Sequence, residues 1–203
     1  NGSSLYCDGT FTSWKGNDNL VVDDGGSVSV KDFSFYNGGN GHSAVVKTGG
    51  SFICRNTFAP HSNSTTDEQA KNFAFDLKIE GGSAQIKSLR LTRAAASLKM
   101  SAGTLKLTDK PMLAADDLSQ IQVTGGEMIW GFDVTQSADD PWYQYMTAHP
   151  DIVCGCNKLH MDQGTLFRHS GTFHVSQFEN LSTTASMQVD CDRLVFDGLN
   201  WPF

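Results

Sequence analysis

Hydrophobic and polar residues alternate along most of this chain, and short glycine turns interrupt the alternation at regular intervals. Residues 98–107 show the pattern, with alternating apolar residues on both sides of a turn at Gly103. Similar phrases span residues 77–86, 121–130 and 159–168, and looser copies begin at Val21, Val45 and Leu181. The intervals between successive copies are 24, 32, 21, 23, 38 and 22 residues. A repeat of this length predicts a solenoid, in which each unit buries its apolar side against its neighbours.

The alternation also predicts which side chains face the core. Positions two apart on a strand share one face, so two positions after each glycine turn are expected to point inward. The first inward column comprises Val28, Phe52, Ala84, Leu105, Met128, Leu166 and Met187, and the second comprises Val30, Cys54, Ile86, Leu107, Trp130, Arg168 and Val189. Residues between the columns should face outward. Among these, Ile53, Ile129 and Phe167 are apolar, which predicts that one outer face is covered or packs against something.

A stack of such coils, with parallel strands about 4.8 Å apart, would pair the backbone of every coil except the first and the last. A coil of about 21–24 residues with three short strands resembles the right-handed parallel β-helix of the pectin-lyase-like superfamily and of bacterial surface passenger domains. The resemblance covers roughly residues 20 to 199, is one of architecture, and carries no catalytic residue with it. We therefore expect an all-β, right-handed parallel β-solenoid of about seven coils. An antiparallel β-sandwich is the competing interpretation.

The spacing of the copies predicts the domain organisation. Residues 1–19 are expected to form an N-terminal cap or lead-in, and residues 20–203 the β-solenoid domain. The two long intervals predict flanking loop insertions near residues 56–72 and 135–157. Helix is expected to be scarce, and the best helical candidate is residues 66–72.

Composition and charge narrow the possible partners. The 203-residue chain has 39% hydrophobic and 18% charged residues, 20 glycines and 5 prolines, which suits many short strands joined by tight turns. Its formal net charge of −7 disfavours nucleic acid, which requires clustered Lys and Arg. No apolar run approaches the length of a membrane span. The chain begins with Asn1 rather than Met, which indicates a processed mature protein or an excised piece, and either origin is compatible with a secreted or cell-surface protein.

The five cysteines permit two disulfides and one free thiol in an oxidising compartment. The candidates are Cys7, Cys54, Cys154, Cys156 and Cys191. One expected bridge joins Cys154 or Cys156 to Cys191, and the next plausible pair is Cys7 with Cys54. Because Cys54 sits in an inward column, it could instead be a small buried apolar residue.

Metal-like spacing occurs once, in Cys154, Cys156 and His160. Zinc would need a fourth ligand, which no recognisable motif supplies, so disulfide pairing is favoured and we expect neither a metal nor a cofactor. The acidic pairs at residues 23–24, 116–117 and 139–140 are expected to form turns, since neighbouring Asp residues on a strand point to opposite faces. No catalytic residue is predicted.

Two kinds of surface site are expected outside the coils. Trp142, Tyr143 and Tyr145 could form a platform for a sugar ring or a partner protein, or could instead fold down over the flank of the coils. The Asn-X-Ser/Thr sequons at Asn1, Asn63 and Asn180 are candidate glycosylation sites.

These patterns favour a non-enzymatic, secreted or cell-surface structural or adhesive β-solenoid. An uncapped coil exposes unpaired backbone groups and core side chains, so association into a homo-oligomer, filament or matrix is expected, end to end or side to side. The alternative is a carbohydrate-active enzyme or sugar-binding module of β-helical fold. A fragment of a phage tail fibre or spike, expected to be trimeric, is a third possibility. A groove that gathers Asp, Lys or Arg from three adjacent coils would favour the carbohydrate-active alternative.

Overall fold

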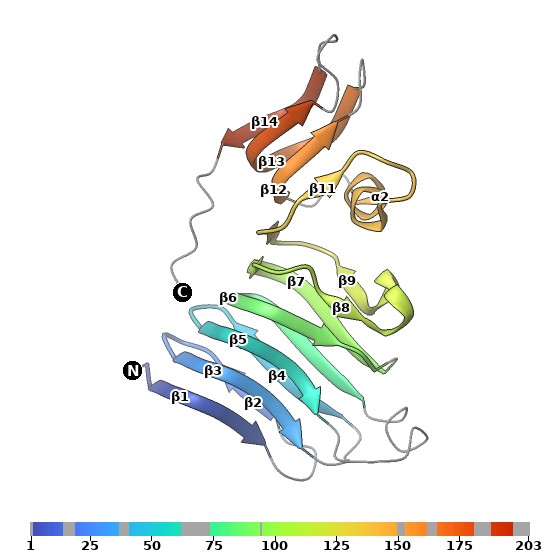
Figure 1. The fold of residues 1–203 in the computed structure, drawn as a ribbon. Coiled ribbons are helices and arrows are strands. Elements are labelled where there is room, and N and C mark those ends of the chain that lie inside the picture. Colours follow the sequence, from blue (N-terminus) through green and yellow to red (C-terminus); the bar gives the residue numbers. More distant parts are fainter. Residues whose placement is uncertain are drawn as a thin grey trace. The chain divides into compact units, whose positions relative to one another are not determined.

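The computed structural model describes residues 2–13, 19–36, 41–61, 74–93, 95–149, 153–161, 166–180 and 188–196. The chain divides into two compact units, Asn1–Gly126 and Glu127–Phe203, and each is described by itself. Within the described residues, all the strand pairings within each unit are parallel, and successive strands stack as coils (Figure 1). The predicted all-β solenoid of about seven coils is therefore confirmed.

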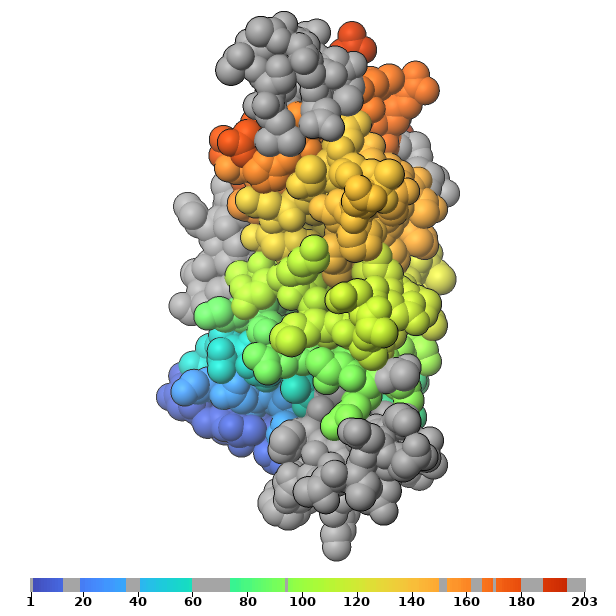
Figure 2. Space-filling model, turned by 45° about the vertical axis from the view of Figure 1, so that its right-hand side comes forward, coloured from blue at the N-terminus to red at the C-terminus, as the bar shows by residue number. Residues whose placement is uncertain are grey.

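The first unit is built from strands and two short 3-10 helices. The strands are β1 (Ser4–Ser13), β2 (Asn19–Val22), β3 (Ser27–Tyr36), β4 (His42–Lys47), β5 (Ser51–His61), β6 (Phe75–Leu91), β7 (Ala96–Leu107), β8 (Met112–Leu113) and β9 (Ile121–Val123). The 3-10 helices are η1 (Ala114–Asp116) and η2 (Leu118–Gln120). The segment that carries η1 and η2, yellow-green in Figure 2, forms part of this unit's surface, where Asp116 and Asp117 are exposed.

Three faces make up each coil of the first unit, because the pairing shifts register at the corners between them. Face 1 stacks residues 4–7, 27–30, 51–54, 83–86 and 104–107. Face 2 follows each of these segments along the chain and includes the pairs Phe11–Phe33 and Phe33–Phe58. Face 3 stacks β2, β4, the start of β6, the start of β7, and β9. The repeated phrase of the sequence is thus a face 3 strand, a corner and a face 1 strand.

The inward columns predicted for the first unit form its core. Val30, Cys54, Ile86 and Leu107 are fully buried, as are Phe52 and Leu105 in the other column. On face 2, the Phe33 ring stacks on Phe11 and Phe58 with centroids 5.4 Å and 5.0 Å away. Equivalent residues therefore lie above one another from coil to coil, and each coil completes the core of the next.

Glycine is required at the corner between faces 3 and 1. Gly103 has a φ of 86°, a left-handed conformation that strains any residue with a Cβ. A Cβ added there would lie 2.2 Å from the carbonyl oxygen of Gly82 in the coil below. The glycine turn seen in the sequence is therefore a close backbone approach between stacked corners.

The second unit continues the same pattern with one helix. Its elements are β10 (Glu127–Trp130), β11 (Val134–Thr135), α2 (Pro141–Ala148), β12 (Val153–Met161), β13 (Leu166–Asn180) and β14 (Gln188–Phe196). Face 1 stacks β10, residues 153–156, 172–175 and 193–196. Along the chain, α2 stands between a face 2 strand and a face 1 strand, where the other coils have their face 3 strand. No helix within the described residues is long and apolar enough to be a membrane span.

Two predictions for the second unit are wrong. The phrase at residues 159–168 is not a face 3 strand followed by face 1, because Leu159 lies on face 2 and residues 166–169 lie on face 3. Phe167, expected to face outward, is fully buried, whereas Arg168, expected in an inward column, is exposed. Met187, expected in the first inward column, lies outside the described residues.

Ile129 lies between the two inward columns, and its outward side is covered, as its apolar character predicts. Its exposed fraction is 3%, and it pairs in register with Gly155, which has no side chain. The His174 imidazole on β13 reaches across β12 to β10, where its Nε2 lies 3.1 Å from Glu127 Oε1. Ile53 is half-buried.

The expected cap and insertions also take definite forms where they are described. Residues 4–13, within the expected cap or lead-in, form β1, which pairs with β3 on faces 1 and 2. The insertion near residues 135–157 contains α2, which the sequence analysis did not predict. The helical candidate at residues 66–72 lies outside the described residues.

Candidate functional site

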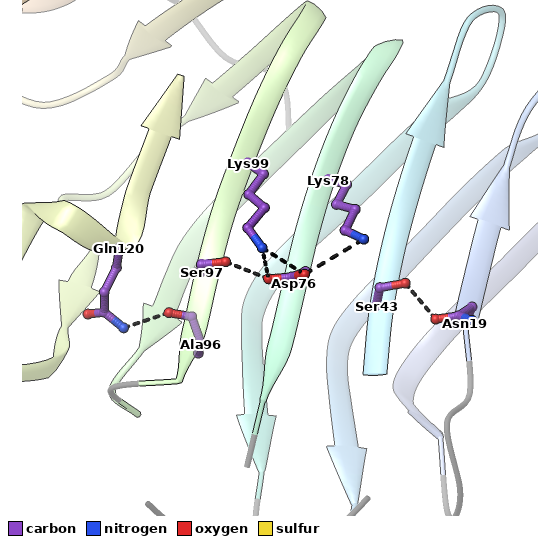
Figure 3. A network of polar contacts seen from close by, with 8 residues as sticks. All are labelled: Asn19, Ser43, Asp76, Lys78, Ala96, Ser97, Lys99 and Gln120. Atoms are coloured by element: carbon purple, nitrogen blue, oxygen red, sulfur yellow. Dashed lines mark hydrogen bonds and ion pairs between the residues drawn. The ribbon is translucent and has the colours of Figure 1, made fainter. Parts of the chain in front are cut away.

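Polar side chains form a ladder along the outer side of face 3 in the first unit. Ser43 donates a hydrogen bond to Asn19 one coil away, with a separation of 2.6 Å. In the next two coils, Ser97 Oγ donates to Asp76 Oδ1, and Lys99 Nζ lies 2.9 Å from the same oxygen (Figure 3). Asn19, Ser43, Asp76 and Ser97 share one register position, because each pairs with the next on the neighbouring strand.

Asp76 is the electrostatic centre of this ladder. Burial raises the pKa of its carboxyl group, but hydrogen bonds from Ser97 and Lys99 and the charges of Lys99 and Lys78 outweigh that effect, so the pKa is lowered overall. Asp76 is therefore ionised at neutral pH and holds Lys99 closely. Lys78 Nζ is 3.7 Å from Asp76 Oδ2, a looser ion pair that leaves most of its ammonium donors available.

A shallow hollow lies beside the ladder and crosses three coils. It has a volume of about 280 Å³. Its lining residues are Lys78, Glu80, Lys99, Met100, Ser101, Gln122 and Thr124. Lys78, Lys99 and Gln122 occupy equivalent register positions on β6, β7 and β9. None of these residues is predicted as a site residue from the sequence, although the same position of the repeated phrase carries Lys, Lys and Gln.

A second hollow, of about 370 Å³, lies at the edge formed by β1 and β2. Residues 2–5, 20–24 and 26–28 contribute to its lining. Val21 and Leu5 are exposed there, as is Tyr6 on the same strand as Leu5. Among the described strands, β1 pairs only with β3, and β2 pairs only with β4. This edge therefore combines apolar side chains with backbone groups that no described strand pairs.

The three aromatic residues proposed as a binding platform lie on α2. Trp142 is 2% exposed and packs against the buried Trp130, with ring centroids 5.0 Å apart. Tyr145 is also buried, and only Tyr143 is half-buried. α2, yellow-orange in Figure 2, instead presents Gln144 and Thr147 to the surface of the second unit. The faces of two of the three rings are thus turned into the fold, and the binding role of these residues stays a prediction.

The expected disulfides are absent among the cysteines, all five of which are free thiols. Cys7 pairs in register with Val30, and Val30 with Cys54, so the two cysteines lie two rungs apart. That separation, about 9.6 Å, exceeds the Cα distance a disulfide can span. No bridge joins Cys191 to Cys154 or Cys156 either. Burial raises the pKa of the Cys54 thiol to about 12, as it does for Cys154.

The spacing of Cys154, Cys156 and His160 does not create a metal centre. Both cysteine side chains are buried on face 1, whereas His160 lies on face 2 and contacts carboxylates. His160 Nδ1 is 2.8 Å from Glu179 Oε2, and His160 Nε2 is 3.5 Å from Asp133 Oδ2. Within the described part of the chain, no group of three His, Cys, Asp or Glu side chains is arranged to hold a metal ion.

One residue of each acidic pair lies in a turn, as expected, or caps a helix, which was not expected. The carbonyl of Asp23 accepts a 2.7 Å hydrogen bond from Gly26 N in the corner turn. Asp117 Oδ1 accepts from Ser119 N at the start of η2. Asp140 caps α2 by accepting from the backbone N–H groups of Trp142 and Tyr143. The carboxylates of Asp117 and Asp140 therefore stabilise local backbone structure, whereas Asp23 contributes its backbone carbonyl.

One of the three candidate glycosylation sites lies in the described part of the chain. Asn1 and Asn63 lie outside the described residues, and Asn180 is the last residue of β13. The use of these sequons stays a prediction.

Comparisons with known proteins identify no relative of this chain. No protein-family model, curated protein or solved structure matches the chain. The resemblance to the pectin-lyase-like superfamily is therefore supported at the level of architecture, a parallel β-solenoid, and no family match supports the superfamily assignment.

Proposed function

We propose that this chain is a non-enzymatic structural or adhesive β-solenoid, secreted or held at a cell surface, which associates with further copies of itself through the edges of its coils. The observation that carries the proposal is the exposure of core positions at those edges. A parallel coil edge offers both backbone hydrogen-bonding groups and an apolar column to a further rung.

At the β1 edge, Leu5 occupies the same inward column as Val28 and Phe52. Those two residues are 7% and 0% exposed, whereas Leu5 is 37% exposed. Leu5 is more exposed because β3 is the only described strand that pairs with β1, so no described strand covers the other side of β1. The hollow of about 370 Å³ beside Leu5 offers room for the apolar side chains of another rung.

The β14 edge of the second unit has the same character. Phe196 pairs in register with Val175, which pairs with Cys156, and both of those residues are fully buried. Phe196 is 65% exposed although it holds the same inward position. Among the described strands, β14 pairs only with β13.

A second copy of the chain is the occupant that suits both edges. β14 presents a face 3 segment followed by a face 1 segment, and β2 and β1 present the same two faces. Leu194 and Phe196 hold the face 1 positions equivalent to Leu5 and Cys7. A copy stacked head to tail would thus continue parallel pairing and bury apolar residues of both edges. Side-by-side association is less favoured, because Ile129 and Phe167, two of the three apolar residues that would support it, are buried.

Size-exclusion chromatography with light scattering over a range of concentrations tests the proposal. The chain is expected to form larger species as its concentration rises, and Leu5→Lys is expected to reduce them by placing a charge in the joint. Met112→Lys is the matched control, because Met112 is 49% exposed but lies on β8, which pairs with β6 and not with a strand of the β1 edge. A chain that stays monomeric at high concentration would refute self-association. An equal effect of both variants would place the contact elsewhere.

A further inference from the structure

The hollow on face 3 of the first unit presents polar groups that the fold does not use. Glu80, Ser101 and Gln122 are exposed and make no side-chain hydrogen bond with any described residue. Lys78 contributes an ammonium group that is only loosely paired with Asp76. Acceptors and donors therefore face the same hollow from three successive coils, which is an arrangement suited to a ligand with many hydroxyl groups.

The charges around the hollow nearly cancel. The two ammonium groups of Lys78 and Lys99 stand against the carboxylates of Asp76 and Glu80. Asp76 stays ionised at neutral pH because Ser97 and Lys99 donate hydrogen bonds to it. A polyanion would gain little attraction here, and the net charge of −7 on the whole chain would oppose its approach.

Size and spacing limit the ligand further. The volume of about 280 Å³ is at the small end for a ligand site, and it suits one or two rings of a longer chain. Lys78, Lys99 and Gln122 lie on adjacent rungs, which are about 4.8 Å apart. This spacing is comparable with the length of one sugar residue, so successive residues of an extended chain would meet equivalent positions of successive coils.

We infer that this hollow binds a short stretch of a neutral, hydroxyl-rich polysaccharide. The inference rests on the proposed adhesive function and assigns it a ligand and a site. Glu80 accepts hydrogen bonds from sugar hydroxyls, Lys78 donates to sugar oxygens, and Gln122 does both. A single shallow site of this kind binds weakly, with a Kd of about 1 mM, and repetition of the site along an assembly raises the overall affinity.

NMR titration of the isotope-labelled chain with neutral and acidic tetrasaccharides tests the inference. The neutral probes are cellotetraose, maltotetraose, mannotetraose and tetra-N-acetylchitotetraose, and the acidic probe is tetragalacturonate. At least one neutral probe is expected to shift the backbone amide signals of Lys78, Lys99 and Gln122 in a saturable way. Tetragalacturonate is expected to bind more weakly than that probe.

Matched variants separate the site from the rest of the surface. Gln122→Ala is expected to weaken binding about tenfold, the effect of losing hydrogen bonds worth about 1.4 kcal/mol. Gln177→Ala, an equally exposed glutamine on face 2 of the second unit, is expected to leave binding unchanged. Lys78→Ala should weaken binding, and the exposed Lys110→Ala should not.

Each contrary result has a separate meaning. If none of the neutral probes shifts these signals, or if tetragalacturonate binds most tightly, the inference is overturned. It is also overturned if Gln122→Ala and Gln177→Ala bind equally well. The same variants are measured by light scattering, where Gln122→Ala is expected to associate like the parent chain. Failed sugar binding with intact association would thus refute the site alone, whereas intact binding by a strict monomer would refute self-association alone.

Discussion

Replacing Phe33 by alanine tests the claim that stacked coils share one core. Phe33 is 1% exposed, and its ring lies within 5.6 Å of the rings of Phe11, Phe35, Phe52 and Phe58, measured between centroids. Truncation of a buried Phe in such surroundings lowers the free energy of unfolding by about 3–5 kcal/mol. The four aromatic contacts place Phe33→Ala in the upper part of that range, at about 4–5 kcal/mol.

Phe11→Ala is the matched control on the neighbouring rung. Phe11 is half-buried on the β1 edge and, among the described rings, stacks on Phe33. Its removal is expected to lower the free energy of unfolding by about 1–2 kcal/mol, since less apolar area returns to water. The predicted difference between the two variants is therefore about 2–3 kcal/mol.

Urea unfolding followed by circular dichroism, at a protein concentration low enough to limit association, measures this difference. The slope of the transition is compared between variants so that a change in stability is not confused with a change in cooperativity. If Phe33→Ala fails to fold, Phe33→Leu provides the comparison, with a loss of about half the size. Equal losses for the interior and edge positions would refute the shared core, because they would show that neighbouring coils do not bury Phe33.

Three further predictions test separate parts of the fold. Gly103→Ala should lower Tm far more than Gly9→Ala, because a Cβ at residue 103 would lie 2.2 Å from Gly82 O, whereas a Cβ at residue 9 meets nothing within 4 Å. Similar melting temperatures of the two variants would contradict the corner geometry. Asp140→Ala should lower the free energy of unfolding of the second unit, followed by tryptophan fluorescence, by about 1 kcal/mol through loss of the α2 cap, and Asp139→Ala by less than about 0.5 kcal/mol. In the native chain Cys154 should react with iodoacetamide much more slowly than Cys7, because Cys154 is buried and burial raises the pKa of its thiol to about 12, whereas Cys7 is half-buried. Fast labelling of Cys154, or a disulfide at either residue, detected by mass spectrometry, would contradict this arrangement.

The fold class was accessible from the sequence because two features repeat together. Alternating apolar residues define the strands, and a glycine between them marks the corner where stacked backbones approach closely. In the first unit this pairing is reliable, and Phe52, Ala84 and Leu105 lie in one column as the alternation predicts. The parallel pairing follows, because equivalent segments can share a column only when they run in the same direction.

The misplaced phrase at residues 159–168 shows where such reasoning fails. A face 2 strand with Leu159 and Met161 also alternates, and the glycine after it imitates a corner between faces 3 and 1. The true corner is at Gly171, which has a φ of 115°. Sequence periodicity alone does not distinguish one face from another, because all three faces bury every second residue.

The candidate binding surface was less accessible than the fold. The lysines of the hollow look like ordinary solvent-facing residues of a strand, and their meaning comes from the register that sets Lys78 beside Lys99 and Asp76 between Ser43 and Ser97. The helix α2 had a usable signal, Asp140 followed by Pro141, which is a capping residue before a proline at the first helical position. The aromatic residues that follow this signal are also typical of a binding platform, whereas in the structure Trp142 and Tyr145 are buried in the core.

Methyl NOEs in a deuterated, methyl-labelled sample show directly whether the coils are stacked with parallel strands. Parallel stacking predicts contacts between Leu77 and Leu98, between Leu98 and Ile121, and between Ala84 and Leu105, since each pair lies on adjacent rungs. It predicts no direct contact between Leu77 and Ile121, which are two rungs and about 9.6 Å apart. Absence of the adjacent-rung contacts, or contacts from Leu77 to residues of a strand running in the opposite direction, would contradict the stacked parallel coils.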